Sequence, residues 1–409
     1  MSDVSINYKG TEIANMSASG TKTLTTQGKY CEDDITINYT KPVPVEVEEK
    51  DVNFFDYDGT LLYSYTAQEF ANLTELPANP THSGLTAQGW NWTLNDAKTY
   101  VNEMGGLDIG QYFITDDNKT RLYLTIDNLK TFYLGIGLNG TATIEWGDGT
   151  SDTISGTSAG TTIYTQHTYS NGGDYVIKIS SSGTYRLGSG SIYSNVLSPS
   201  QTNSQKNIIY LNMINKIELA SNCEVGRFAF ASMLNLKSIT TTSSTKNADS
   251  ASYNGTNLKY ILCPNNCLGG ALFQTCYNLK RVSIPIMAQT NTTALSFSNS
   301  NKIDRVWLPN NVINLNSVLI GGANDVSIIK LPNSIVTISN RAFMDAYGLK
   351  VADFRNFDHI PTLTLDNLFR NNQDDLKIVI PDNLYSSWTT ANQWSAFASY
   401  MIKASDYVE

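Results

Sequence analysis

The feature that most constrains the fold is a short phrase, Leu-x-x-(Ile/Val)-x-(Ile/Leu)-Pro, that recurs through residues 208–382. Successive copies begin 21 to 27 residues apart. A period of this length is typical of a solenoid, in which each unit supplies one short strand and a return segment and buries its apolar side only against its neighbours. Clear copies occupy residues 258–264, 279–285, 303–309 and 326–332, and degenerate copies begin at Leu236, Leu349 and Leu376.

An Ala-Phe or Leu-Phe pair stands shortly before several of the repeat leucines, and we expect its phenylalanines to stack in an inner column. They are Phe230, Phe273, Phe343 and Phe369. The combination of Ala-Phe, Asn-Leu-Lys-x-Ile and Pro resembles the BspA-like leucine-rich repeats of bacteria, and the solenoid is expected over residues 205–385. Such repeats occur on cell-surface adhesins and on phage-encoded proteins, so the resemblance implies a binding surface and no particular chemistry.

The repeat pattern also predicts which side chains face outward. Positions three and five after the leucine are apolar and are expected to face inward, so positions two and four face outward, because side chains alternate along a strand. An aromatic ring beside an arginine is typical of binding hot spots and of sugar-stacking surfaces. The alternative is that these side chains only cover a neighbouring strand or a partner subunit. The candidate ligand-binding residues are Tyr260, Arg281, Arg305, Trp307 and Lys330.

The N-terminal region has a different pattern. Residues 1–40 alternate apolar and polar side chains around a Gly/Thr/Ser-rich middle, which predicts a small β module. This segment resembles the N-terminal module of prophage tail and baseplate proteins, a resemblance that implies attachment to other tail proteins. Residues 41–50 are rich in proline and charge and are expected to form an extended linker.

Residues 51–127 are predicted to form a small α+β unit. Thr66 and Glu69 have the spacing of a capping box that opens a short helix, and a second helix is expected over residues 94–104. Two hairpins complete the expected unit. The first joins residues 52–56 to 60–65, and the second joins residues 112–115 to 121–124.

The turn of the first hairpin has a second interpretation. The segment around Asp56 and Asp58 resembles motif I of haloacid-dehalogenase-type phosphatases, which implies a nucleophile and an acid/base, with Asp116 and Asp117 as a magnesium pair. That fold requires a parallel sheet of repeated βα units, which the sequence does not predict. Asp-Gly is common turn chemistry, so we favour a hairpin turn and expect no enzyme activity.

Residues 128–190 contain three linked motifs: Trp-Gly-Asp-Gly-Thr at Trp146, His-Thr-Tyr at His167, and Gly-x-Tyr at Gly173. Their order resembles the PKD-type, immunoglobulin-like β-sandwich, which implies a spacer or adhesion module. Asp148 is a candidate calcium ligand, although no further oxygen ligands cluster near it in sequence. At the other end of the chain, residues 386–409 are expected to cap the solenoid, with one helix over residues 388–400.

Composition excludes several classes of function. The chain has 409 residues, only 16% of them charged, and a net charge of −9, which argues against nucleic acid and anionic membranes as partners. No apolar run is long enough to span a bilayer. Three histidines far apart in sequence give no metal or acid/base cluster, so no cofactor or metal is expected. The cysteines are expected to be reduced and mostly buried; they are Cys31, Cys223, Cys263, Cys267 and Cys276.

Together these patterns predict a multidomain, mainly β, non-enzymatic protein. The N-terminus lacks the pattern of a secretory signal, so extracellular-type modules are expected here on a virion released by lysis. The predicted function is that of a phage tail-tip or tail-fibre protein that binds a host surface glycan or protein through its solenoid. Residues 1–40 would contact other tail proteins, and a homo-oligomer is expected, commonly a trimer. The alternative is a BspA-like adhesin on a bacterial cell surface.

Overall fold

A computed structural model gives the fold of the chain. It divides into two compact units, Met1–Glu48 and Glu49–Glu409. The structure describes residues 4–8, 11–16, 20–25, 34–39, 47–127, 130–187, 212–226, 229–230, 233–242, 244, 246–247, 251–252, 257–263, 266–267, 271–284, 296–315, 319–339, 341–364 and 367–408.

The first unit consists of two antiparallel hairpins. Strand β1 (Val4–Tyr8) pairs with β2 (Thr11–Met16), and β3 (Gly20–Thr25) pairs with β4 (Asp34–Tyr39). Strands β1 and β4 fall on the two alternating runs of the sequence, whereas β2 and β3 lie in the Gly/Thr/Ser-rich middle between them. Residues 41–46 of the expected linker, and Cys31, lie outside the described residues.

A four-stranded sheet with the order β6-β5-β8-β7 opens the second unit. Strands β5 and β8 are parallel, and their two neighbours are antiparallel to them. The capping box of Thr66 and Glu69 forms as predicted, and the second helix ends at Gly105 in the left-handed conformation. The elements are β5 (Val52–Phe55), β6 (Leu61–Tyr65), α1 (Ala67–Ala71), β7 (Leu85–Trp90), α2 (Leu94–Met104) and β8 (Leu107–Thr115).

The second expected hairpin is wrong. Strand β9 (Thr120–Ile126) follows β8 after a short turn but does not pair with it. It pairs instead with β12 (Gly173–Ser181) and β14 (Ile214–Glu218). The turn thus carries the chain from one sheet into another, where alternate side chains of β9, such as Leu122 and Leu124, are buried.

The segment expected to be a β-sandwich forms one continuous sheet with the first turns of the solenoid. Strand β10 (Thr131–Glu145) pairs with β11 (Ser151–Thr168) along one edge, and along the other with both β12 and β13 (Tyr185–Leu187). On that edge β13 pairs with residues 136–138 and β12 with residues 142–145, so the long strand has room for both; on the other edge a register shift after Gly137 interrupts its pairing with β11. Two separate sheets, as the sandwich expectation required, are not formed by these strands.

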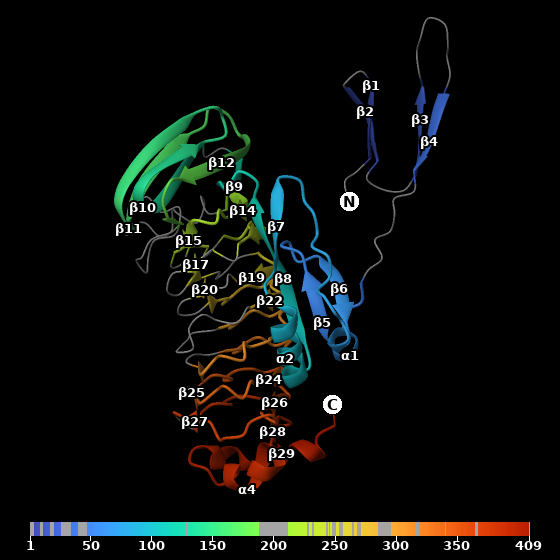
Figure 1. The fold of residues 1–409 in the computed structure, drawn as a ribbon, viewed down its shortest axis with the longest axis vertical. Coiled ribbons are helices and arrows are strands. Elements are labelled where there is room, and N and C mark those ends of the chain that lie inside the picture. The colour runs from blue at the N-terminus through green and yellow to red at the C-terminus, as the bar shows by residue number, and fades with distance from the viewer. Residues whose placement is uncertain are drawn as a thin grey trace, which may run out of the picture. The chain divides into compact units, whose positions relative to one another are not determined.

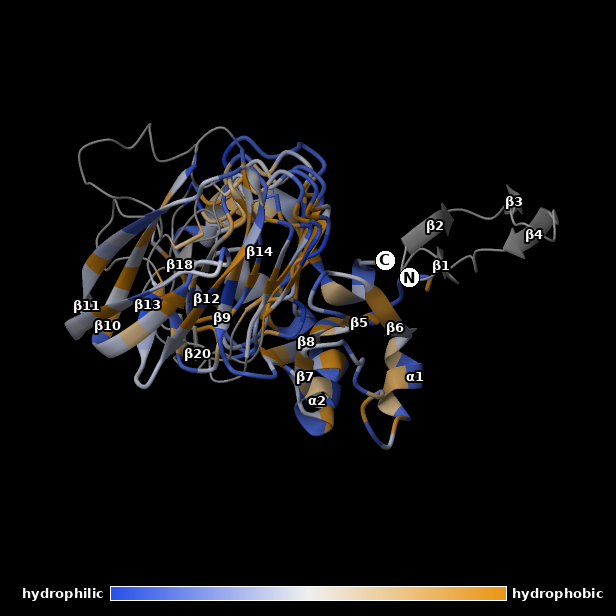
Figure 2. Ribbon diagram, turned by 90° about the horizontal axis from the view of Figure 1, so that it is seen from above, coloured by the Kyte–Doolittle hydropathy of each residue, from blue (hydrophilic) through white to orange (hydrophobic). Residues whose placement is uncertain are grey.

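The solenoid turns stack so that their short parallel strands line up in two columns, which we call ladders, although the hydrogen bonding along each is broken into several sheets (Figure 1). Figure 2 shows the α+β unit to one side of the stacked turns. The ladder that carries the repeat phrase contains β14, β16 (Ser238–Thr240), β19 (Tyr260–Leu262), β22 (Arg281–Ser283), β24 (Ile328–Lys330), β26 (Val351–Asp353) and β28 (Lys377–Ile380). The return segments contribute β15 (Cys223–Val225), β17 (Lys246–Asn247), β18 (Ala251–Ser252), β20 (Asn266–Cys267), β21 (Ala271–Leu272), β23 (Asn314–Leu315), β25 (Thr337–Ile338) and β27 (Thr362–Leu363).

The solenoid interior confirms the predicted inner column. All four phenylalanines of the column are buried. Phe343 stacks on Phe369 with ring centroids 5.3 Å apart, and Phe273 stacks on Phe297 at 5.1 Å. Because each ring packs on the next turn, the column joins neighbouring repeats directly. Cys223, Cys263 and Cys276 are free and buried, as expected for these three.

The single helix expected over residues 388–400 is wrong. The chain forms a short 3-10 turn (Asp382–Leu384), helix α4 (Tyr385–Trp388) and a 3-10 segment (Trp394–Tyr400). Gln393 has a φ of 65°, which interrupts any continuous helix. Strand β29 (Met401–Lys403) then extends the ladder beside β28, and a last 3-10 turn follows (Ala404–Asp406). No helix among the described residues has both the length and the apolar character needed to cross a membrane.

Candidate functional site

The α+β unit lies on the outward side of the ladder that carries the repeat phrase. We call this side, formed by β16, β19, β22, residues 305–308 and β24, the strand face. Tyr100 of α2 donates a hydrogen bond to the carbonyl oxygen of Leu308 at 2.6 Å. Tyr112 of β8 donates to the carbonyl oxygen of Cys263 at 3.0 Å. These bonds join residues more than 150 positions apart and fix the unit on the solenoid.

Glycines of the α+β unit receive the large side chains of the strand face. A Cβ atom added to Gly59 would come within 2.5 Å of Tyr260 Cβ, and one added to Gly110 within 2.2 Å of the Tyr260 hydroxyl. A Cβ on Gly106 would come within 2.5 Å of Trp307 Cζ2. The two surfaces approach closely because these positions have no side chain.

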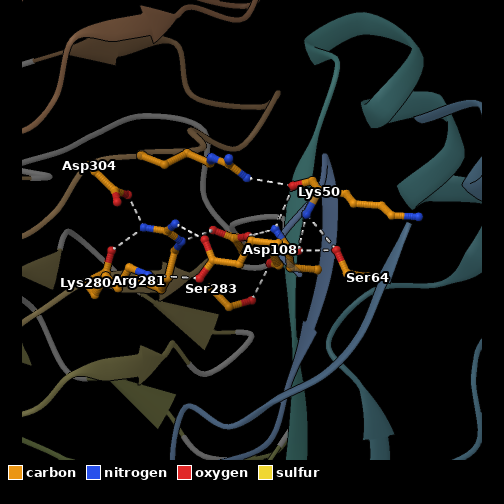
Figure 3. Close-up of polar contacts among 10 residues, drawn as sticks. Lys50, Ser64, Asp108, Lys280, Arg281, Ser283 and Asp304 are labelled. Carbon is orange, nitrogen blue, oxygen red and sulfur yellow. Dashed lines mark hydrogen bonds and ion pairs between the residues drawn. The ribbon is translucent and has the colours of Figure 1, made fainter. Parts of the chain in front are cut away.

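Arg281 forms the centre of an ionic network across the same interface (Figure 3). Its guanidinium group contacts the carboxylates of Glu49 and Asp304 and lies 3.8 Å from that of Asp108. Lys280 reaches Glu49 at 3.0 Å. Only 4% of Arg281 is exposed, so its charge is balanced by carboxylates and not by water. Glu49 belonged to the expected linker, yet it is tied to the solenoid.

Asp108 is a buried carboxylate on β8 that faces this network. The backbone carbonyl oxygen of Asp108 accepts a hydrogen bond from the Ser283 hydroxyl at 2.7 Å. The same hydroxyl accepts a hydrogen bond from the Asn91 side chain at 2.9 Å. Burial raises the pKa of the Asp108 carboxyl to about 6, against the opposing effects of Arg281 and of a hydrogen bond from Asn53. The interface therefore contains a carboxyl that titrates close to neutral pH.

The remaining candidate residues belong to the same interface. Arg305 donates to the carbonyl oxygen of Lys50 at 3.1 Å, and its guanidinium lies 5.8 Å from the Trp307 ring centre. Trp307 packs against the apolar core of the α+β unit. Lys330 lines a smaller cavity of about 240 Å³ with Gly105. All five candidates thus meet the α+β unit, Lys330 at its margin, where a Cβ atom on Gly105 would come within 3.2 Å of the Lys330 Nζ.

The expectation that these side chains face solvent is wrong for the central repeats. Tyr260 is only 5% exposed, because the unit from residues 51–115 covers the face that the alternation correctly directs outward. Ile328, in a later repeat, is 40% exposed. A ligand-binding role for the five residues stays a prediction. In this structure the strand face is covered by the α+β unit of the same chain.

Two clefts border the covered face, and the candidates Tyr260 and Arg281 contribute to the lining of the first one. The first, which we call the edge cleft, has a volume of about 470 Å³ and lies where hairpin β5-β6 meets the solenoid. The second, of about 540 Å³, lies between later repeats and the C-terminal residues Tyr407 and Val408. The sequence does contain a pattern that points to these clefts. Lysine often follows the repeat leucine, and Lys259, Lys280 and Lys350 line the clefts.

The phosphatase-like residues form a turn. Asp56 accepts a backbone hydrogen bond from Gly59, and its carboxylate lies 2.7 Å from His82 Nε2. Asp58 accepts from the backbone of Thr60 at 2.9 Å, as in an Asx turn. Across the residues that the structure describes, no group of three or more His, Cys, Asp or Glu side chains is arranged to hold a metal ion.

The three motifs of residues 128–190 converge on one structural cluster. His167 stacks on Trp146 with ring centres 4.9 Å apart, and its Nε2 lies 2.7 Å from Asp148. Tyr169 donates to the carbonyl oxygen of Trp146 at 2.9 Å. A hydrogen bond from Thr150 contributes most to lowering the pKa of the Asp148 carboxyl to about 2, and His167 adds to it. These contacts hold strands together and occupy the carboxylate that was a candidate for calcium.

Comparison with known proteins identifies the repeats. Residues 202–317 and 268–397 match the family described as BspA type Leucine rich repeat region, in six copies. No curated protein sequence gives a significant match. Among solved structures, the chain is similar to a leucine-rich repeat protein from Bacteroides ovatus ATCC 8483, with 19% identity and a TM-score of 0.28. That match covers 41% of this chain and 56% of the other. The C-terminal half therefore consists of BspA-type leucine-rich repeats, which indicate a surface or adhesion-type protein.

Proposed function

We propose that this protein is a non-enzymatic recognition protein of a phage tail tip or fibre, which binds a glycan or protein on the host surface through its solenoid. The observation that carries the proposal is a repeat solenoid braced by the α+β unit, with open clefts along the margin of the covered face. Such a rigid, preformed surface suits recognition, because little conformational freedom is lost when a ligand binds.

Two further features support this role. The strands that the Trp146 cluster holds together, which share one sheet with the first turns of the solenoid, would act here as a spacer. The hairpins of residues 4–39 would dock on other tail proteins. A homo-oligomer, commonly a trimer in such fibres, and a location on the virion belong to the same proposal.

The second candidate is a bacterial surface adhesin. The observation that favours it is the repeat type itself, which matches a BspA-type model across residues 202–397. Both candidates use the same solenoid, so they differ in where the protein is displayed and in what carries it.

Immunogold electron microscopy separates the two candidates. An antibody raised against the whole chain should label the tail tips of purified virions. Label on the envelope of bacteria that release no virions would support the adhesin instead. In parallel, the fluorescently labelled whole protein should bind cells of a susceptible strain and fail to bind resistant strains; equal binding to both would count against receptor recognition.

A further inference from the structure

We propose that the edge cleft is the ligand site and that it takes a saccharide carrying a carboxylate, such as a uronic or sialic acid residue. The proposal rests on the recognition function, because it names the ligand class for that solenoid. It differs from the sequence-based expectation, which placed the ligand on the strand face that the α+β unit covers.

Two parts of the chain build the cleft. Phe55, Gly59 and Leu61 of hairpin β5-β6 form one wall, and the repeats that carry Tyr260 and Lys280 form the other. The close approach of Gly59 to Tyr260 fixes the distance between the walls. A volume of about 470 Å³ falls within the range of about 300–1,000 Å³ that small-ligand sites occupy. The cleft is therefore already formed before a ligand arrives.

The charges around the cleft favour an anionic group. Arg281 and Lys280 already pair with Glu49, and Arg281 also pairs with Asp304. Lys259 and Lys302, which are exposed, have no carboxylate partner among the residues that the structure describes. On a chain of net charge −9, two such ammonium groups at one cleft offer a local site for a carboxylate.

Lys302 is also held in position. Its Nζ donates a hydrogen bond to Asn278 Oδ1 at 2.7 Å, and both side chains line the cleft. Lys259 and Lys280 lie on adjacent turns, since the backbone N–H of Lys280 donates to the carbonyl oxygen of Lys259 at 2.8 Å. The ammonium groups therefore follow the solenoid axis, and an extended ligand would meet them in succession.

The other lining groups favour a saccharide over a simple anion. Asp304 and Asp325 also line the cleft and would repel a polyanion such as a phosphate chain. Carboxylates and the Asn278 amide, however, suit hydroxyl groups, which both donate and accept. The apolar atoms of Leu61, which is only partly buried, offer a surface to the C–H face of a sugar ring. A sugar with one acid group and several hydroxyls would match all three kinds of lining group: the ammonium groups, the carboxylates and amide, and the apolar atoms.

Isothermal titration calorimetry with the whole protein tests the ligand class. The probes are matched pairs: sialyllactose against lactose, and a tetrasaccharide of alternating glucuronate and N-acetylglucosamine against N-acetylglucosamine tetramer. A glutamate hexapeptide and inorganic phosphate represent the competing anions. We expect at least one acidic saccharide to bind at least tenfold more tightly than its neutral partner, and the affinity to fall as sodium chloride is added.

The matched variants are the double substitution K259Q/K302Q and the single substitution K237Q. Lys237 follows the leucine of an earlier repeat, is exposed, and does not line the cleft. We expect K259Q/K302Q to weaken binding of the acidic saccharide at least tenfold and K237Q to leave it unchanged. All three lysines are exposed, so equal urea unfolding curves should show that the fold is intact.

Four results would overturn the proposal: no binding of any acidic saccharide, equal binding of its neutral partner, unchanged binding by K259Q/K302Q, or tighter binding of the hexapeptide or phosphate. The cell-binding assay separates this failure from failure of the recognition function. If K259Q/K302Q binds host cells as well as the unmodified protein, the cleft is not the site although recognition stands. If the unmodified protein binds no cells, the recognition function itself fails.

Discussion

Gly106 lies directly against the indole of Trp307, and a Cβ atom at Gly106 would come within 2.5 Å of the ring. The two residues are 201 positions apart in sequence. Each belongs to a different kind of structure: Gly106 precedes β8 of the α+β unit, and Trp307 stands on the strand face of a repeat. Their contact joins the central solenoid to this unit, so we expect changes at the contact to alter the stability of both.

Gly106→Ala should destabilise the protein. The backbone of Gly106 has no positive φ, so alanine adds only steric clashes, with the Trp307 ring and with the carbonyl oxygen of Asp51, which would lie 2.6 Å from the new Cβ. We expect these clashes to lower the free energy of unfolding by about 1–3 kcal/mol. Urea unfolding measures the effect. Gly160→Ala is the matched control, because the nearest atom to its new Cβ would be Ser158 Oγ at 3.5 Å. Equal losses in the two variants would mean that the contact at Trp307 does not hold the unit in place.

Arg281→Met should also destabilise the interface. Methionine keeps much of the side-chain volume but leaves the carboxylate of Asp108 buried without its nearest cation. Breaking a buried ion pair by removing one partner costs about 3–5 kcal/mol. In a double-mutant cycle, R281M combined with D108N should lose less than the sum of the single changes, because no uncompensated carboxylate then remains at position 108. Strict additivity would indicate that the two groups do not interact.

Local signals in the sequence correctly predicted much of the fold. The repeat period places side chains such as Ile261 and Val306 inside, and the structure buries them. The helix expected over residues 94–104 has those bounds, because Thr93 caps its start and Gly105 ends it. Such features depend on neighbours a few residues away, which one sequence displays.

The docking of the α+β unit could not be predicted in the same way. Tyr260 and Arg281 look like exposed binding residues in a repeat, and nothing near them in sequence shows that Gly59 and Asp108 will cover them. Complementarity between two surfaces depends on the packed fold and not on local periodicity. The prediction of a hairpin between β8 and β9 failed for a related reason. Hairpin signals are local, whereas β12 and β14, the strands with which β9 pairs, lie far along the chain.

Tyr169→Phe tests whether the motif of residues 128–190 has a structural role. The buried hydroxyl of Tyr169 donates to the carbonyl oxygen of Trp146 at 2.9 Å, and its loss should lower the free energy of unfolding by about 0.5–1.5 kcal/mol. Tyr164→Phe serves as the control, because Tyr164 is 42% exposed. Thermal or urea unfolding compares the two. A stable Y169F variant, equal to Y164F, would show that this bond does not hold the strands together.

Asp108→Asn should stabilise the protein at neutral pH. The carboxyl has a pKa of about 6 in the folded protein and an ordinary pKa of 3.8 in the unfolded chain, so folding favours the protonated form. That contribution is fully present below pH 3.8 and is lost as the pH rises through 6. At about 1.4 kcal/mol per pKa unit, the unmodified protein loses roughly 3 kcal/mol from this group over the whole titration, most of it between pH 4 and 7. Asparagine remains neutral and should avoid the loss.

Urea unfolding at several pH values between 4 and 7 checks this prediction. The difference between D108N and the unmodified protein should be small at pH 4 and should grow until about pH 7. Asp117→Asn is the control of opposite sign, because a hydrogen bond from Arg121 lowers the pKa of the Asp117 carboxyl. Its substitution should therefore weaken the protein at neutral pH, by an amount kept small by solvent. If D108N also weakens the protein at pH 7, attraction to Arg281 outweighs the burial of the Asp108 charge, and the interface depends on that ion pair.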